Sequence, residues 1–323
     1  MTDNNIHASG TRRTVVVTGA SGGVGRAAAI AFARDGAQVA LLARGQPGLD
    51  GAQREIGAVG GRALAIALDV ADADAVEGAA ERIEAELGPI DVWVNAAMVT
   101  IFSPVSSLTP SEVKRATEVT YLGTVHGTMA ALKRMRARER GVIVQVGSAL
   151  SYRAIPLQSV YCGAKFAIRG FTDALRVELM HERSGVHLTM VQLSAFNTPQ
   201  FDWARSHMPR RAQPVPPIFQ PEIAARGIVW ASKHRRREVC VGWPAVKAIW
   251  GNKLMPRFAD RLLARQGYDG QMTGERQAPD APDNLYEPVV DKARTHGRFD
   301  KRARGRSLQL WWTTHRPPWR RIE

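Results

Sequence analysis

The stretch VVVTGASGGVGRAAAIAFARDG, residues 15–36, joins a run of β-branched residues to an alanine-rich run through a glycine-rich turn. The glycines let the backbone turn sharply and come close to a ligand. The helix that follows offers free N–H groups and the positive end of its dipole to an anion. A strand, this turn and a helix in that order predict a site for the pyrophosphate of a dinucleotide. The expected contacts in the turn are Gly19, Ser21, Gly23, Val24 and Gly25.

Beyond this stretch, short apolar runs alternate with helical stretches throughout residues 12–245. Near-continuous apolar strands separated by helices predict a parallel sheet, covered on both faces and built from right-handed βαβ units. We therefore expect an α/β protein with a doubly wound parallel sheet (a Rossmann fold) of about seven strands, followed by a C-terminal extension. The expected strands are 14–19, 38–43, 62–70, 90–97, 141–149, 186–194 and 238–243.

The rest of the chain divides by composition. Residues 1–11 are expected to be a disordered N-terminus, 246–300 a helical or irregular extension, and 301–323 a basic tail rich in tryptophan. The net charge of the chain is +14, and residues 246–323 hold 16 Lys/Arg against 9 Asp/Glu. Half of the positive surplus therefore lies in the last quarter of the chain.

Cysteine content, N-terminus and hydropathy bear on the compartment. The chain has two cysteines, and its first residues, MTDNNIHASGTRR, show no charged-then-apolar leader. Neither a disulfide framework nor export is expected from these features. No apolar run reaches the roughly 18 residues of a membrane-spanning helix. We expect a cytoplasmic protein, and because the histidines show no metal-binding spacing, no metal is predicted.

The end of the second expected strand bears on the type of cofactor. Many NAD-binding folds place an acidic residue there to bind the ribose 2′-OH, whereas this chain has Ala43 followed by Arg44. A guanidinium can make paired hydrogen bonds to a 2′-phosphate. NADP is therefore the preferred cofactor and NAD the alternative. The other interpretation of Arg44 is an ordinary solvated loop arginine.

The motifs together resemble the short-chain dehydrogenases/reductases of the compact type. TGASGGVG, residues 18–25, fits the TGxxxGxG pattern of that family. Asp69 and Val70 match the pair that contacts adenine in the family. Asn95 and Ala96 begin a changed version of its NNAG segment. The resemblance implies that these four residues belong to the cofactor site.

The catalytic signature of the family lies further along the chain. Tyr161 and Lys165 form its YxxxK motif, and Ser148 lies thirteen residues before the tyrosine. The resemblance implies that Tyr161 exchanges a proton with the substrate oxygen, that Lys165 lowers the pKa of the tyrosine and binds the nicotinamide ribose, and that Ser148 hydrogen-bonds the substrate oxygen. It covers about residues 12–243.

Three positions depart from the family pattern. Thr120 stands where the family has a catalytic asparagine, and we expect a modified proton relay there, because threonine can still hydrogen-bond a water or the backbone. After the sixth strand, Ser194 and Ala195 replace the usual Pro-Gly, and Thr198 is expected to keep the contact to the nicotinamide carboxamide. Met98 either narrows the space near the nicotinamide or is an ordinary packing residue.

A long proline-rich segment, residues 201–220, follows the sixth strand and carries large apolar side chains. Such a segment is typical of an active-site lid with an apolar inner face. We expect an apolar alcohol or carbonyl substrate. Its arginines can instead bind an anionic group or face water. The apolar residues are Phe201, Trp203, Met208 and Phe219, and the arginines are Arg205, Arg210 and Arg211.

The C-terminal extension leaves alternatives open. Residues 245–265 place apolar side chains at helical spacings, with Pro256 breaking or restarting the helix. Such a helix packs on the main domain or on another subunit, or forms a basic amphipathic surface for anionic lipid. The favoured interpretation is packing. No motif for base recognition accompanies the charge, so no specific nucleic-acid partner is predicted.

These observations predict an NADP-dependent oxidoreductase that interconverts an alcohol and a carbonyl and forms a homo-oligomer, a dimer or tetramer, as the resemblance implies. The alternative is a catalytically weak NADPH-binding sensor or scaffold that acts through its basic tail. Thr120 and the changed NNAG segment favour this alternative, whereas the intact Ser148, Tyr161 and Lys165 oppose it.

Overall fold

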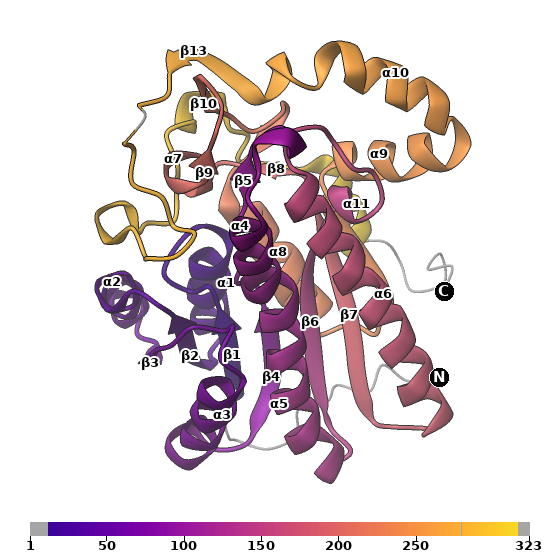
Figure 1. Cartoon of the computed structure of the whole chain (residues 1–323). Coiled ribbons are helices and arrows are strands. Elements are labelled where there is room, and N and C mark those ends of the chain that lie inside the picture. The colour runs from indigo at the N-terminus through magenta and orange to yellow at the C-terminus, as the bar shows by residue number, and fades with distance from the viewer. Residues whose placement is uncertain (1–11, 279, 316–323) are drawn as a thin grey trace.

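A seven-stranded parallel sheet lies at the centre of the computed structural model, which describes residues 12–278 and 280–315. Its strand order is β12-β7-β6-β4-β1-β2-β3 (Figure 1). The predicted fold class is thus confirmed, and all seven expected strands are present. Their bounds are β1 Thr14–Thr18, β2 Gln38–Ala43, β3 Arg62–Ala67, β4 Ile90–Asn95, β6 Gly141–Ser148, β7 Val186–Leu193 and β12 Glu238–Val241.

The central strands are apolar along their whole length because helices cover both faces of the sheet. Every residue of β1 is buried. One core layer lies between the sheet and α1 (Gly23–Arg34), α2 (Gln46–Ala58) and α8 (Pro221–Ala231). The opposite layer holds α3 (Ala73–Leu87), α4 (Pro110–Thr117), α5 (Gly123–Ala137) and α6 (Ser159–His181).

Helices α4 and α5 form one long helical element interrupted by a π-helical turn, Glu118–Leu122. It begins at the predicted capping box, in which the Thr109 side chain accepts from the Glu112 N–H and the Glu112 carboxylate accepts from the Thr109 N–H. Thr120 lies inside the π-helical turn and is fully buried. A π-helical turn is wider than an α-helical turn, and here it brings the Thr120 side chain to the segment that follows β4.

The segment predicted as a lid folds into one short helix and three short strands. Two of the strands pair with strands of the main domain, and the third pairs antiparallel with the extension. The lid and the extension are therefore joined by strand pairing. Its elements are α7 Gln200–Trp203, β9 Arg205–Ser206 (with β5 Ile101–Phe102), β10 Arg210–Ala212 (with β13 Met272–Arg276) and β11 Ile218–Phe219 (with β8 Ala195–Phe196).

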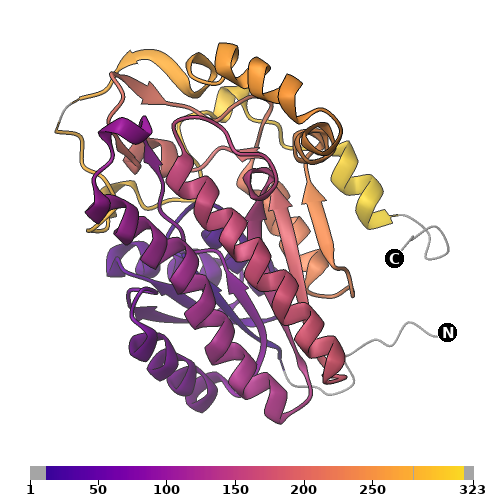
Figure 2. The same ribbon diagram turned by 45° about the vertical axis from the view of Figure 1, so that its right-hand side comes forward.

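The C-terminal extension gathers at one end of the sheet, where its orange-to-yellow segments lie together in Figure 2. α9 (Trp243–Leu254) ends just before Pro256, which begins α10 (Pro256–Gln266). α11 (Leu308–His315) packs on α8 and β12 through the buried Leu310. Single 3-10 turns complete the described chain: Val105–Ser107, Ala149–Ser151, Asp269–Gln271, Val290–Lys292 and Asp300–Arg302.

Two predictions on the termini concern residues that the structure does not describe. The expected disordered N-terminus, residues 1–11, and residues 316–323 of the basic tail lie outside the described residues. Among the helices that are described, none combines the length and the apolar character needed to cross a membrane.

Candidate active site

A cavity of about 660 Å³ lies at the carboxyl ends of the strands, where ligands of such sheets bind. Most of the site residues expected from the sequence line it. Asn95 and Thr120 are not among the lining residues. Those that line the cavity are Gly19, Ser21, Gly23, Val24, Gly25, Arg44, Asp69, Val70, Ala96, Ser148, Tyr161, Lys165 and Thr198.

The turn between β1 and α1 forms the cradle that the glycines predict. Gly19 has a φ of +70° and Gly23 a φ of +53°, which side-chain-bearing residues rarely adopt. A Cβ on Gly25 would lie 2.3 Å from the carbonyl oxygen of Gly19, so only glycine fits. The turn and the N-terminus of α1 together suit an anion such as the pyrophosphate of a dinucleotide, and one N–H of the turn, that of Gly23, already donates to the Arg294 carbonyl at 3.0 Å.

A charged cluster lies at the ends of β2 and β3. Arg115 pairs with the Asp69 carboxylate, which also accepts from the Ala71 N–H at 3.0 Å. Burial raises the pKa of Asp69, but these hydrogen bonds and the Arg115 charge outweigh it and lower that pKa. Arg44 lines the cavity as well, yet its guanidinium donates to the carbonyl oxygens of Asn284, Leu285 and Tyr286. The arginine expected to bind a 2′-phosphate thus already has three acceptors from the extension.

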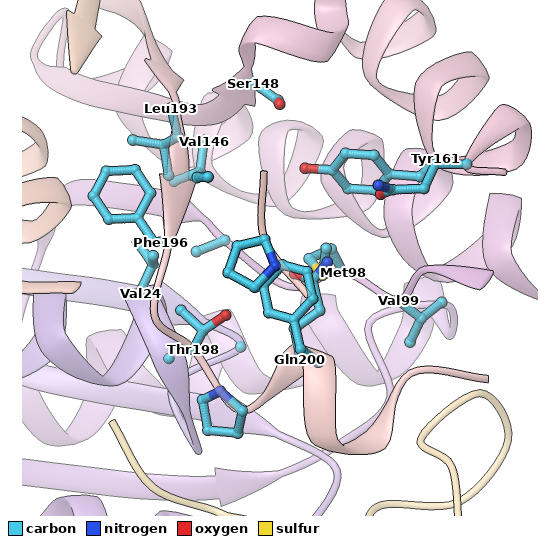
Figure 3. A pocket seen from close by; sticks show the side chains of 18 of the residues that line it. Val24, Met98, Val99, Val146, Ser148, Tyr161, Leu193, Phe196, Thr198 and Gln200 are labelled. Carbon is cyan, nitrogen blue, oxygen red and sulfur yellow. The ribbon is translucent and has the colours of Figure 1, made fainter. Parts of the chain in front are cut away.

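Ser148, Tyr161 and Lys165 meet at the opposite end of the cavity. Ser148 ends β6, and its hydroxyl accepts from the Leu150 N–H at 3.1 Å. Tyr161 and Lys165 lie one turn apart on α6, and the Lys165 Nζ is 5.6 Å from the centre of the Tyr161 ring. Figure 3 shows the Ser148 and Tyr161 hydroxyl groups pointing into the same part of the pocket, with Met98 nearby. The distance and the shared direction suit a proton donor beside a tuning charge.

Burial changes the acidity of both α6 side chains. Burial raises the pKa of Tyr161, and a hydrogen bond with Ser148 opposes part of that rise. Burial lowers the pKa of Lys165 to about 8. The Lys165 ammonium donates to the carbonyl oxygen of Val146 at 2.7 Å, which fixes its position beneath the cavity. Burial therefore favours the uncharged form of both side chains, and for Tyr161 the hydrogen bond with Ser148 opposes this effect.

Asn95 and Thr120 lie behind the wall of the cavity. The Asn95 amide accepts from the Trp93 indole at 2.9 Å and donates to Thr128 and Gln145, so it ties β4 to β6 and α5. The Thr120 hydroxyl accepts from the Val99 N–H and donates to the Val99 carbonyl, both at 3.1 Å. Both side chains hold the end of β4 in place.

The outer wall of the cavity includes apolar side chains of the lid. Phe201 and Trp203 line it, together with Pro214, Val215 and Pro216. Phe219, by contrast, is buried in the core, and Met208 packs against Phe102. The three lid arginines are paired with carboxylates: Arg205 with Glu112 and Asp283, Arg210 with Asp269, and Arg211 with Glu275.

The extension supplies lining residues that the sequence reasoning did not find. They come from α9, α10 and the segment after residue 283, and they carry no local signature of ligand binding. Only their apolar character connects them with a cavity wall. They include Ala245, Ala248, Leu262, Leu263, Asn284, Pro288, Val289, Val290 and Ala293.

Comparison with known proteins agrees with this geometry. The family model described as short chain dehydrogenase matches residues 13–208. An uncharacterized oxidoreductase of Bacillus subtilis, YxnA, is 32% identical over 277 residues, which cover 85% of this chain and 78% of that protein. The chain therefore belongs to the short-chain dehydrogenase family and is an oxidoreductase.

Two solved structures resemble this one. A metagenomic short-chain oxidoreductase in complex with NADP is 27% identical, with a TM-score of 0.61, and the match covers 72% of this chain and 98% of that one. An alcohol dehydrogenase from the archaeon Thermococcus sibiricus, complexed with 5-hydroxy-NADP, is also 27% identical, with a TM-score of 0.62 and coverage of 71% and 95%. Both matches leave more than a quarter of this chain uncovered.

Proposed function

We propose that this protein is an NADP(H)-dependent oxidoreductase that interconverts an apolar alcohol and its carbonyl compound, with Tyr161 as general acid and base. One observation carries the proposal: Ser148, Tyr161 and Lys165 line the same cavity as the glycine turn after β1. A bound nicotinamide would supply or accept the hydride there. The residues of the chain then have to bind the substrate oxygen and move its proton.

The proton chemistry follows from the positions of the three side chains. In the reducing direction the buried phenol of Tyr161 donates its proton to the substrate oxygen, and the Ser148 hydroxyl donates a hydrogen bond to the same oxygen as negative charge develops. In the oxidising direction a positively charged nicotinamide and the Lys165 ammonium favour the phenolate and lower the pKa of Tyr161. With the oxidised nicotinamide bound, the ammonium would thus help Tyr161 to act as a base.

A screen for NADPH oxidation with carbonyl compounds tests this proposal. We expect turnover by the wild type and its loss in Tyr161→Phe, which removes only the hydroxyl. NADPH binding, followed by fluorescence, should persist in the variant. Turnover that survives in Tyr161→Phe would contradict the proposed role. NADPH binding without turnover in the wild type would instead favour a sensor or scaffold.

The preference for NADP rests on Arg44. No acidic side chain stands at the end of β2, and Arg44 lines the cavity beside Asp69. NADPH should bind more tightly than NADH, and the margin should collapse in Arg44→Ala. Because Arg44 also binds the 284–286 carbonyls, Arg115→Ala is the matched control: it removes another donor to Leu285. Arg115→Ala should weaken both nucleotides equally and keep the margin.

The apolar substrate class rests on the lid. Phe201, Trp203 and Val215 give the outer wall of the cavity an apolar surface, and the lid arginines are paired with acids. Apolar carbonyl compounds should therefore have the lower KM. Trp203→Ala should raise that KM more than it lowers kcat. Reduction of small polar carbonyls alone would contradict this part of the proposal.

We also infer a homo-oligomer formed through α5 and α6, which lie side by side in both views (Figures 1 and 2). Met129 on α5 is 61% exposed, and Val177 and Met180 on α6 are 63% and 71% exposed. Apolar side chains gathered on adjacent helices are typical of a subunit contact. Light scattering should give a dimer or tetramer that Met180→Lys dissociates, and a monomeric wild type would contradict the inference.

We further propose a cytoplasmic location, with peripheral membrane contact through the extension. No residue of α10 is buried. The helix combines exposed Phe258 and Leu262 with Arg257, Arg261 and Arg265, and exposed Leu254 precedes it. Apolar and cationic side chains on one helix suit an anionic bilayer surface. The full-length protein should sediment with phosphatidylglycerol vesicles at low salt. The Phe258→Ser variant should sediment with them to a smaller extent. Equal binding to phosphatidylcholine vesicles, or none, would contradict it.

A further inference from the structure

A segment of the extension, residues 284–294, crosses the outer side of the cofactor cavity; we call it the strap. Asn284, Pro288, Val289, Val290 and Ala293 of the strap line the cavity. Its carbonyl groups accept hydrogen bonds from Gly23, Arg26, Arg44 and Arg115, which belong to the main domain. We propose that the strap is the outer wall of the adenosine half of the cofactor site and must open for the cofactor to leave. This inference rests on the proposed nicotinamide cofactor.

The first end of the strap is held over the ends of β2 and β3. Arg44 Nη1 donates to the carbonyl oxygens of Leu285, at 3.3 Å, and Tyr286, at 2.7 Å. Arg115 Nε donates to the Leu285 carbonyl at 3.2 Å while its other end pairs with Asp69. The Leu285 side chain is fully buried in the core layer of α3 to α6. The strap is thus anchored by charge-assisted hydrogen bonds and by one buried apolar side chain.

The second end of the strap is held over the glycine turn. The Gly23 N–H, in the turn expected to bind pyrophosphate, donates to the Arg294 carbonyl at 3.0 Å. Arg26 Nη1 donates to the Ala293 carbonyl at 2.9 Å. A Cβ on Gly48 would lie 2.9 Å from the Ala293 Cβ, so the strap packs closely on α2. Both ends therefore rest on elements that form the cofactor site.

Strap residues line the cavity together with Gly19, Ser21 and Val70. A segment that borders the cavity in this way acts as a clamp rather than a plug. The cavity volume of about 660 Å³ lies within the range of small-molecule and cofactor sites. A bound nucleotide would then contact both walls. Its adenosine half would be enclosed, and its release would require the strap contacts to break.

Leu285→Ala tests the clamp without touching the cavity wall, since Leu285 is not a lining residue. The protein is loaded with NADPH and mixed with excess NADP+, and the loss of NADPH fluorescence gives the dissociation rate. We expect at least a tenfold faster release and a weaker NADPH affinity in the variant. Leu308→Ala is the matched control: the same substitution in the same extension, at a side chain 83% exposed. Its release rate should equal that of the wild type.

A cysteine pair provides a second test that does not depend on weakening the fold. A Cβ on Gly45 would lie 3.2 Å from the Pro288 Cβ, close to the spacing of a disulfide. Oxidation of Gly45→Cys/Pro288→Cys loaded with NADPH should slow release, oxidation of the empty protein should slow entry, and dithiothreitol should reverse both. Each single-cysteine variant serves as its control.

The outcomes separate this inference from the proposed function. No NADPH binding by the wild type would overturn the proposed cofactor and the clamp together. Binding with release rates that neither Leu285→Ala nor the disulfide changes would overturn the clamp alone. Tighter NADPH binding in Leu285→Ala would show that the strap competes with the nucleotide, and would also overturn the clamp.

Discussion

The floor and the roof of the cavity come from different parts of the chain. The floor consists of strand-end residues, the first turn of α1 and two residues of α6, that is residues 19–25, 96–98, 146–149, 161 and 165; the roof consists of residues 200–203, 213–216, 262–271 and 284–293. Buried backbone and short polar side chains hold the floor. Ion pairs and a few apolar contacts hold the roof. In the proposed function the floor carries the chemistry, whereas the roof selects the substrate and retains the cofactor.

The largest expected effect concerns the floor. Under the proposed function, Tyr161→Phe removes the proton donor, and general acid–base catalysis of this kind contributes about 10²- to 10⁴-fold to the rate. We expect kcat to fall by that factor with little change in stability or NADPH affinity. Single-turnover kinetics measure the rate, thermal melts measure the stability, and NADPH fluorescence measures the affinity. If the NADPH affinity fell by the same factor as kcat, Tyr161 would also bind the nucleotide, and floor and roof would then not differ in the way described.

The second effect concerns the joint between core and roof. Glu112 begins α4, and its carboxylate accepts from Arg205 and His207 of the lid, at 3.2 and 2.9 Å. Burial raises its pKa, but the hydrogen bonds from Thr109, Arg205 and His207 outweigh burial and lower the pKa to about 2. The ionised carboxylate therefore stabilises the fold fully above its ordinary pKa and progressively less as pH falls from about 4.5 to about 2.

Glu112→Gln tests this joint. At pH 7 the variant should lose up to about 3 kcal/mol of unfolding free energy, and its difference from the wild type should shrink as the pH falls below about 4.5. Urea titrations at pH 7, 4.5 and 3 measure the difference. A deficit that stays constant with pH would show that lost packing, not charge, accounts for it.

A smaller effect is expected at Thr120, behind the floor. Its hydroxyl hydrogen-bonds both backbone groups of Val99, and Thr120→Val would leave them without that partner. An unsatisfied buried group costs about 1–3 kcal/mol, so the variant should lose that much stability. Thr120→Ser keeps the hydroxyl and should recover most of it. A lower kcat in fully folded Thr120→Val would indicate the modified proton relay expected from the sequence, because the loss of stability alone would not change the kcat of folded molecules.

The smallest effect is expected on the outside of the roof. Arg210 pairs with Asp269, but the two side chains are 44% and 78% exposed. Exposed ion pairs contribute about 0–1 kcal/mol. Arg210→Ala should therefore change the unfolding free energy by less than about 0.5 kcal/mol and leave the KM for apolar substrates unchanged. A large rise in KM would mean that this arginine binds substrate.

Sequence reasoning found the floor because its determinants are local. The glycine turn, the capping box at Thr109 and the Tyr161–Lys165 pair are each encoded within a few residues, and the doubly wound sheet follows from the alternation of apolar strands and helices. The roof depends on contacts between distant segments that lack such patterns. Nothing in the residues around Arg44 shows that its guanidinium meets the carbonyl groups of Asn284 to Tyr286. Nor does the pattern around Thr120 reveal its bonds to Val99.

The contacts of Arg44 with the strap span about 240 residues of sequence, and this has a consequence for biosynthesis. The ribosome completes the glycine turn, the tyrosine pair and the last strand of the sheet before it makes residue 284. A nascent chain that ends before residue 284 therefore lacks the strap, and the contacts of Arg44 form only after residues 284–286 are made. A premature stop before that point would leave every family motif in place but remove the strap.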